Sequence, residues 1–269
     1  MADAQRARVM AIANQKGGVG KTTTAINLGT ALAACERKVL VVDLDPQGNA
    51  STGFGLTRGD RKRNIYKPLL QGADIRESVV STEVPGLALV PSSVDLAGAE
   101  VELAGAEARE THLRETLRPL LDQYDYILVD CPPALGFLTI NAFVAATSVL
   151  VPLQAEFYAL EGLSHLMKTI ERVRRNFNKG LEIRGIVLTM YDKRNNLCDM
   201  VANDVRDYLG DVVMETVIPR NVRVSEAPSH GKPVIVYDMR CPGSKAYIKM
   251  AGELMRREPD ETPTPAMAG

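Results

Sequence analysis

The sequence predicts an α/β fold, a doubly wound, mostly parallel sheet with helices on both faces. Short apolar segments typical of buried strands alternate with segments whose apolar residues recur at helical spacing. The stretch Ala13–Gly29, "ANQKGGVGKTTTAINLG", is a glycine-rich loop that leads from the first strand into a helix. Asp43, Asp45 and Asp130 stand at the ends of two other apolar segments. Because such sheets bind ligands beyond the carboxyl ends of their strands, the loop and the aspartates predict one common site.

The first half of the chain is expected to supply three strands and two helices. A buried strand over Arg8–Asn14 runs into the glycine-rich loop, and the helical segment "TTTAINLGTALAA" follows the loop. A second strand over Lys38–Asp45 ends on carboxylates, and a short strand, "LALVPS", begins near Leu87. The next apolar pattern predicts one long helix from about Asp95 to Gln123.

The second half continues the alternation. The strand in "YDYILVDCPP" ends at Asp130, and Ser148–Gln154 forms a further strand. Apolar residues three and four positions apart between Leu160 and Val173 predict a helix that faces the core. The last strands are expected in "LEIRGIVLTMYD" and "VVMETVIPRN", on either side of a helix over Cys198–Leu209. A terminal helix is expected from about Gly243 to Arg257.

Length and composition indicate one large domain. The chain has 269 residues, of which 45% are apolar and 24% charged, an ordinary globular balance. We expect the domain to span residues 8–257, after a flexible leader over residues 1–7. The polar, proline-rich segment over residues 258–269, "EPDETPTPAMAG", predicts a disordered tail.

Charge and cysteine usage limit the classes of function. The formal net charge is −1, but Leu163–Arg257 holds 17 Lys and Arg against 11 Asp and Glu, so a polyanion-binding face is sought there. The four cysteines are scattered, no signal peptide is recognisable, and no apolar run approaches the length needed to cross a bilayer. These features predict a cytoplasmic protein with reduced thiols.

The glycine-rich loop predicts a phosphate-binding site. Its glycines let successive N–H groups face a phosphate, and the helix that begins near Lys21 adds its positive dipole end. Lys21 is placed to reach the β- and γ-phosphates, and the Thr22 hydroxyl to bind Mg²⁺. The usual first glycine is replaced by Gln15, and a second lysine, Lys16, stands beside it. The residues predicted to bind nucleotide here are Gly17, Gly18, Val19, Gly20, Lys21, Thr22 and Thr23.

The aspartates at the strand ends predict a hydrolytic site. Asp130 follows an apolar run, as the metal-binding aspartate of the Walker B motif does. Asp43 and Asp45 alternate along a strand and are expected to point to one side, where one orients the attacking water and the other supports the metal. The alternative is that one of the pair only caps the following turn, because Asp-Pro commonly starts one.

Several motifs together resemble a known family. "KGGVGKTT" resembles the deviant Walker A motif of the ParA/MinD ATPases, a class of P-loop ATPases. "DLDPQGN", "DCPP", "TMYD" and "IPRNVRVSEAPSHG" resemble the ParA/Soj-type chromosome-partitioning ATPases in particular. The resemblance covers about Val9 to Arg257, so it includes almost all of the expected domain.

The resemblance implies roles for individual residues. Lys16 matches the signature lysine that reaches the ATP of a partner subunit, and Gly17 matches a glycine at the dimer contact. Asp45 matches the catalytic, water-orienting aspartate and Asp130 the Walker B position. Within "IPRN", the adenine contacts are assigned to Pro219 and Asn221. The implied ligands are ATP and Mg²⁺, held in a homodimer that forms on ATP and separates after slow hydrolysis.

A DNA-binding face is expected in two loops. "MYDKRNNL" and "PRNVRVSEAP" carry Lys193, Arg194, Arg220 and Arg223. Arg194 and Arg223 match positions that, in the family, bind double-stranded DNA without sequence preference. Few aromatic residues and no recognisable helix-turn-helix favour phosphate contacts over base readout. The resemblance also implies a nucleoid-associated protein whose hydrolysis is stimulated by a ParB-type centromere-binding partner.

Two other functions on the same scaffold compete with this interpretation. A MinD-like, membrane-cycling ATPase needs a C-terminal amphipathic helix, whereas this chain ends in an acidic, proline-broken segment, so no stable membrane association is expected. A metabolic or redox enzyme, such as a relative of the nitrogenase iron protein, would need cysteines spaced for a shared cluster.

Overall fold

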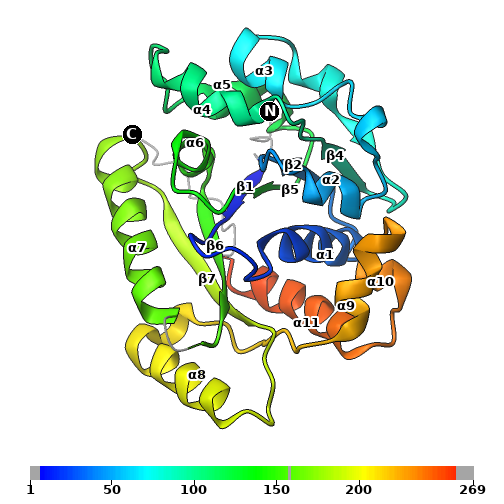
Figure 1. Ribbon diagram of the computed structural model, residues 1–269, viewed down its shortest axis with the longest axis vertical. Coiled ribbons are helices and arrows are strands. Elements are labelled where there is room, and N and C mark those ends of the chain that lie inside the picture. Colours follow the sequence, from blue (N-terminus) through cyan, green and yellow to red (C-terminus); the bar gives the residue numbers. More distant parts are fainter. Residues whose placement is uncertain (1–6, 157–158, 259–269) are drawn as a thin grey trace, which may run out of the picture.

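The computed structural model describes residues 7–156 and 159–258. Seven strands form one sheet in the order β3-β4-β2-β5-β1-β6-β7 (Figure 1). In the part of the chain that the structure describes, the strands of this sheet pair in parallel except β3 with β4, which are antiparallel. The predicted doubly wound, mostly parallel sheet is confirmed. The strand bounds are β1 Arg8–Ile12, β2 Val39–Asp43, β3 Val80–Ser81, β4 Leu87–Val90, β5 Tyr126–Asp130, β6 Ser148–Gln154 and β7 Glu182–Thr189.

Helices cover both faces of this sheet (Figure 1). Helix α1 packs with α11 against one face, while α4 to α8 contribute to the core on the other. The α-helices are α1 Lys21–Ala34, α2 Asn49–Gly53, α3 Tyr66–Gln71, α4 Leu96–Ala104, α5 His112–Leu117, α6 Phe137–Ala145, α7 Ala159–Asn176, α8 Asn196–Leu209, α9 Val222–Glu226, α10 Val234–Tyr237 and α11 Pro242–Arg256. The 3-10 helices are η1 Arg58–Asp60, η2 Ile75–Ser78, η3 Arg118–Leu120, η4 Gly210–Val212 and η5 Ala227–His230.

The central strands are buried on both sides, which is why they read as continuous apolar runs. Along β2, Val39 and Val41 pack into one core, whereas Leu40 and Val42 pack into the other. This is the two-residue alternation of a strand with a hydrophobic layer on each face. The two cores hold the sheet rigidly, so the residues at its carboxyl edge have fixed positions.

The expected long helix over residues 95–123 is wrong, because the chain breaks into α4, α5 and η3. Helix α4 ends at Ala104, next to Gly105, and α5 does not begin until His112. Between them Ala108 has a φ of 47°, a conformation that a helix cannot contain. The apolar spacing continued across this turn, so periodicity alone did not reveal it.

The strand expected in "VVMETVIPRN" is also wrong. The segment runs beside β7 but makes only isolated bridges, from Val213 to Ile186 and from Pro219 to Tyr191. The amides of Met214 and Ile218 donate to β7, whereas Pro219 has no N–H to donate. The strand β3, which sequence patterns missed, has only two residues.

The domain limits remain a prediction. The described part of β1 begins at Arg8 and α11 ends at Arg256, whereas residues 1–6 and 259–269 lie outside the described residues. The leader and most of the tail therefore cannot be compared with their predictions. Within the described ranges, no helix combines the length and apolar character needed to cross a membrane.

Candidate nucleotide site and basic loops

The glycine-rich loop connects β1 to α1 at the carboxyl edge of the sheet. Gly18 and Gly20 have φ values of 75° and 88°, which side-chain-bearing residues rarely adopt. Helix α1 begins directly after Gly20 and has no side-chain cap at its N-terminus. Its first N–H groups are therefore available for an anion. The loop has the local structure that the phosphate-binding prediction requires.

Lys21 is held inside this loop. Lys21 is only 7% exposed. Its Nζ donates a hydrogen bond to the main-chain oxygen of Lys16 at 3.0 Å. Burial lowers the pKa of Lys21, and the nearby carboxylates of Asp130 and Asp45 counteract this change. A buried ammonium close to a helix N-terminus is suited to bind phosphate oxygens.

Asp130 and Asp43 face one another across adjacent strands. They are partners in the register of β2 with β5, and both are fully buried. Burial and the charge of Asp43 raise the pKa of Asp130 well above its usual range, while Thr22 and Lys21 counteract this rise. Among the described residues, neither carboxylate oxygen of Asp130 makes a hydrogen bond of normal geometry. An orphaned carboxylate beside the Thr22 hydroxyl fits a Mg²⁺ ion and its water shell.

Asp43 and Asp45 do not share one role. Strand β2 ends at Asp43, so strand alternation no longer governs Asp45. Asp43 Oδ2 accepts hydrogen bonds from Ser51 N at 2.8 Å and from Ser51 Oγ at 2.6 Å, which anchors α2. Burial raises the pKa of Asp43 to about 6, although the bonds from Ser51 oppose this rise. Asp45 instead lines the nucleotide cavity and accepts a bond from Gln47 N at 3.0 Å.

A cavity of about 520 Å³ opens above the loop, and we call it the nucleotide cavity. Its wall combines the phosphate loop with the segment before α9, a grouping that the family resemblance implied. Asn221 also fixes α9, because its Oδ1 accepts a hydrogen bond from Arg223 N. The site residues named above that line the cavity are Gly17, Gly18, Gly20, Lys21, Thr22, Thr23, Asp45, Pro219, Arg220 and Asn221.

Four residues predicted for the nucleotide site or the dimer contact lie outside the cavity lining. Asp130 and Asp43 are fully buried at the ends of β5 and β2, and Val19 is also buried, with its main-chain oxygen accepting a hydrogen bond from Thr189 Oγ1 at 2.8 Å. The Lys16 side chain forms an ion pair with Glu156, which follows β6. A role for Asp43 in metal binding stays a prediction, and the hydrogen bonds from Ser51 give it a clear structural role.

Sequence patterns missed half of the cavity wall. Gln47 and Asn49 follow Asp45 in "DPQGN", and Met190 follows β7, so their positions beside strand ends were a usable signal. Tyr247 comes from α11 and contacts Thr24 of α1, 223 residues earlier in the chain, with 3.4 Å between the hydroxyl oxygens. The missed lining residues are Gln47, Asn49, Pro133, Thr189, Met190, Ile218, Val224, Ser225, Pro228 and Tyr247.

The four predicted DNA-binding residues come from two adjacent segments, which we call the basic loops (residues 191–195 and 219–223). The bridge between Tyr191 and Pro219, together with the bond from Arg220 N to the Tyr191 oxygen at 3.0 Å, holds these segments together. Lys193, Arg194, Arg220 and Arg223 are all exposed. The prediction that they bind DNA is compatible with this position but is not tested by it.

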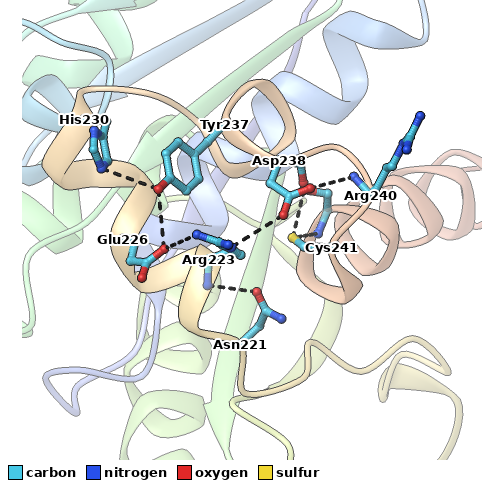
Figure 2. Close-up of polar contacts among 9 residues, drawn as sticks. Asn221, Arg223, Glu226, His230, Tyr237, Asp238, Arg240 and Cys241 are labelled. Carbon is cyan, nitrogen blue, oxygen red and sulfur yellow. Dashed lines mark hydrogen bonds and ion pairs between the residues drawn. The ribbon is translucent and has the colours of Figure 1, made fainter.

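Both family-matched arginines are already paired with carboxylates. Arg194, whose side chain is 88% exposed, binds Asp192 through two nitrogens, at 3.0 and 2.8 Å. These bonds lower the pKa of Asp192 to about 2. Arg223 lies between Glu226, at 2.9 Å, and Asp238, at 3.6 Å (Figure 2). The basic loops therefore present less net positive charge than their sequence suggests.

Figure 2 shows that Arg223 belongs to a cluster of polar side chains that extends across α9 and α10. The Tyr237 hydroxyl donates to Glu226 at 3.4 Å, and the ring of Tyr237 stacks on His230 with 4.9 Å between ring centroids. Asn221, which lines the nucleotide cavity, belongs to the same cluster through Arg223. Helix α9 and its N-cap residue, Asn221, thus carry both a cavity residue and a predicted DNA-binding arginine.

Relatives with known names match this chain over almost its full length. The sequence model of the family described as "AAA domain" matches residues 7–183. The chromosome partitioning protein ParA of Caulobacter vibrioides is 58% identical over 255 residues, which cover 94% of this chain and 96% of that protein. The sporulation initiation inhibitor protein Soj of Bacillus subtilis is 49% identical over 247 residues, which cover 92% and 98%.

Solved structures agree with this assignment of the fold. Cobyrinic acid a,c-diamide synthase of Mycobacterium smegmatis, with bound ADP and magnesium, has a TM-score of 0.82 and 36% identity, and the match covers 93% of this chain and 94% of that one. The cell division ATPase MinD of Pyrococcus furiosus has a TM-score of 0.78 and 28% identity, with coverage of 93% and 99%. With its phosphate loop, paired aspartates and close relatives, this chain belongs to the ParA/Soj family of chromosome-partitioning proteins.

Proposed function

We propose that this chain is a chromosome-partitioning ATPase that uses ATP to control its binding to DNA. One observation carries the proposal: the phosphate loop, Asp45 and Asp130 converge at the edge of the sheet that also bears the basic loops. The relative at 58% identity is named a chromosome partitioning protein, ParA, and the relative at 49% identity is named Soj. Both names favour this function over the MinD-like and the metabolic alternatives. The synthase with a similar structure is less similar in sequence.

The proposed reaction converts ATP and water to ADP and phosphate. Lys21 and the loop N–H groups bind the β- and γ-phosphates, and Pro219 and Asn221 contact the adenine. Asp45 orients a water molecule toward the γ-phosphorus, and the bond from that phosphorus to the β–γ bridging oxygen breaks. Thr22 and Asp130 would hold Mg²⁺, which supplies positive charge to the phosphates.

Lys16 supports the proposal of an ATP-dependent homodimer. Its ammonium points to Glu156 rather than into the nucleotide cavity of its own chain, so it adds no charge to that cavity. We assign Lys16 to the nucleotide of a partner subunit, with Gly17 at the contact between the subunits. Two chains would then complete each other's sites, and hydrolysis would release them.

The proposed DNA contact is nonspecific and depends on the dimer. Lys193, Arg194, Arg220 and Arg223 would contact phosphates of double-stranded DNA, and a dimer would present two such sets, which strengthens binding through effective concentration. A ParB-type centromere-binding protein would stimulate hydrolysis and release the chain from the nucleoid.

The test is DNA binding with ATP, with ADP and without nucleotide, measured for the full chain. We expect binding only with ATP, and a loss of about tenfold or more in both Lys16→Ala and Arg194→Ala. Arg118→Ala is the matched control, because Arg118 is 76% exposed and also pairs with a carboxylate, Glu115, but lies before β5 at the opposite edge. Equal binding with and without ATP would refute the proposal.

A further inference from the structure

A second, smaller cavity lies beside the nucleotide cavity. It has a volume of about 350 Å³ and lies among η1, α3 and the segment after β4. Four cationic residues line it, and we call this cavity the basic pocket: Arg58, Arg61, Lys62 and Lys67. Asp95 is the one acidic residue among the lining residues, so cations outnumber carboxylates four to one. The motifs of the proposed function leave this pocket unexplained.

Arg61 is buried and fixed in the wall of the pocket by hydrogen bonds. The residue is 8% exposed, and its Nη2 donates to Thr52 Oγ1 at 2.6 Å and to the Leu56 oxygen at 2.8 Å. Its buried Nε has no hydrogen-bond partner among the described residues. Burial lowers the pKa of Arg61, and the charge of Asp43 opposes this change. Among the described residues Arg61 forms no ion pair, and a buried guanidinium without a bound anion is energetically costly.

The other cations of the pocket also lack acidic partners. In the described part of the chain, Arg58, Lys62 and Lys67 form no ion pair. The acidic side chains nearby are engaged elsewhere. Asp60 Oδ2 accepts bonds from the amide and hydroxyl of Thr57, and Asp95 accepts a bond from Ser93. The pocket thus keeps an uncompensated positive charge, unlike the basic loops.

Two contacts link this pocket to the catalytic loop. Gln47 lines both the basic pocket and the nucleotide cavity, so the two cavities adjoin at this residue. Arg61 lies directly against Gly48, where an added Cβ would be 2.0 Å from Arg61 Nη1. Gln47 and Gly48 follow Asp45 closely, so an anion in the pocket would lie next to the loop that carries the catalytic carboxylate.

We propose that the basic pocket binds inorganic phosphate, in particular the phosphate released by hydrolysis in the nucleotide cavity. Guanidinium and ammonium groups are the preferred partners of phosphate oxygens, and the pocket, at about 350 Å³, has room for a phosphate ion beside its four cationic side chains. This inference rests on the proposed ATPase function, because hydrolysis supplies the phosphate. Bound phosphate holds the Asp45–Gly48 loop against Arg61 after the reaction.

The test is titration of the full-length, ADP-loaded chain with inorganic phosphate, followed by calorimetry. We expect Arg58→Ala/Lys62→Ala to weaken phosphate binding about tenfold or more, which corresponds to the loss of two charge-assisted contacts. Both side chains are exposed, so the fold should be retained, and Arg61 keeps its bracing bonds. Lys245→Ala/Lys249→Ala removes the same charge from exposed positions on α11 and should leave the affinity unchanged.

Each alternative result has a clear meaning. Phosphate that binds only at Lys21 would be insensitive to the double substitution, and equal affinity in all three proteins would overturn the inference. A loss of DNA binding without a change in phosphate affinity would also overturn it and assign the pocket to the DNA contact. ATP turnover is measured in parallel. If the wild type hydrolyses ATP but its phosphate affinity does not depend on the pocket residues, only the proposed phosphate site is refuted. If phosphate binding depends on the pocket residues but no ATP is hydrolysed, the ATPase proposal is refuted.

Discussion

The nucleotide cavity and the basic loops lie at the same edge of the sheet, but their charges are arranged in opposite ways. At the nucleotide site, Lys21 and Asp130 are buried, and the Asp130 oxygens have no hydrogen-bond partner of normal geometry among the described residues. In the basic loops, Arg194 and Arg223 are exposed and already bound to carboxylates of the same chain. The buried groups are therefore ready for a ligand, whereas the loop arginines must exchange one partner for another.

This difference explains why DNA binding would depend on ATP. An exposed arginine that leaves a carboxylate for a phosphate gains little, because both pairs are solvated and screened by salt. A single chain would then bind DNA weakly, and a dimer would gain affinity from two sets of contacts. The buried nucleotide site, by contrast, can bind its ligand within one chain.

The largest effect is expected for a substitution of the buried Lys21 in the nucleotide cavity. Lys21→Ala removes the only cationic side chain that lines the phosphate end of the nucleotide cavity among the described residues, and we expect ATP affinity to fall about 100-fold or more. Calorimetric titration with ATP measures this change. Lys245→Ala, on the surface of α11, is the control. Retained affinity in Lys21→Ala would mean that the cavity binds ATP in another way.

A smaller effect, in the opposite direction, is expected in the basic loops. Asp192→Asn removes the partner of Arg194, so DNA affinity in the presence of ATP should rise by about two- to fivefold at low salt and by less at high salt. Asp207→Asn makes the same charge change at another exposed position, on α8, and serves as the control. If both variants bind alike, the pairing of Arg194 does not limit DNA binding.

The smallest effect concerns the segment that links the two regions. Glu253 on α11 accepts hydrogen bonds from Glu215 N at 2.8 Å and Thr216 N at 2.9 Å, on the way to Pro219. Burial alone would raise the pKa of Glu253, but these bonds and Arg257 hold it below its usual value. A lowered carboxylate pKa stabilises the fold at neutral pH, and this contribution is lost as pH falls.

Glu253→Gln should therefore reduce the free energy of unfolding at pH 7 by about 1–2 kcal/mol. The difference from the wild type should shrink as the pH falls below the usual value for a glutamate, near 4.5. Urea denaturation at both pH values measures it. A difference that stays constant with pH would show that the charge of Glu253 is not responsible.

The sequence was most informative where chemistry and local structure coincide. Glycines that adopt positive φ, a lysine after them and aspartates at apolar strand ends predicted the cavity floor and its position in the sheet. The same pattern could not separate Asp43 from Asp45, because their difference depends on Ser51, a partner on α2. The ion pair of Lys16 with Glu156 was likewise not predictable, because the two residues are 140 positions apart in the sequence and meet only in the fold.

The errors of the fold prediction have a similar origin. Apolar spacing over residues 95–123 satisfied a helix on both sides of the turn near Ala108, so the break left no periodic signal. The apolar run before Pro219 looked like a strand, yet its hydrogen bonds to β7 are too irregular to form one. In both places the apolar pattern was right, but the backbone conformation that carries it was not a regular helix or strand.

The most direct test of the account is the release of the chain from DNA after ATP is removed. The account assigns hydrolysis to Asp45, so wild type should dissociate while Asp45→Ala stays bound, with a lifetime on DNA at least about tenfold longer. Protein is bound to surface-immobilised DNA in the presence of ATP, the surface is then washed with nucleotide-free buffer, and the rate of protein release is recorded. Equal release of the two proteins would contradict the claim that hydrolysis at this site ends DNA binding.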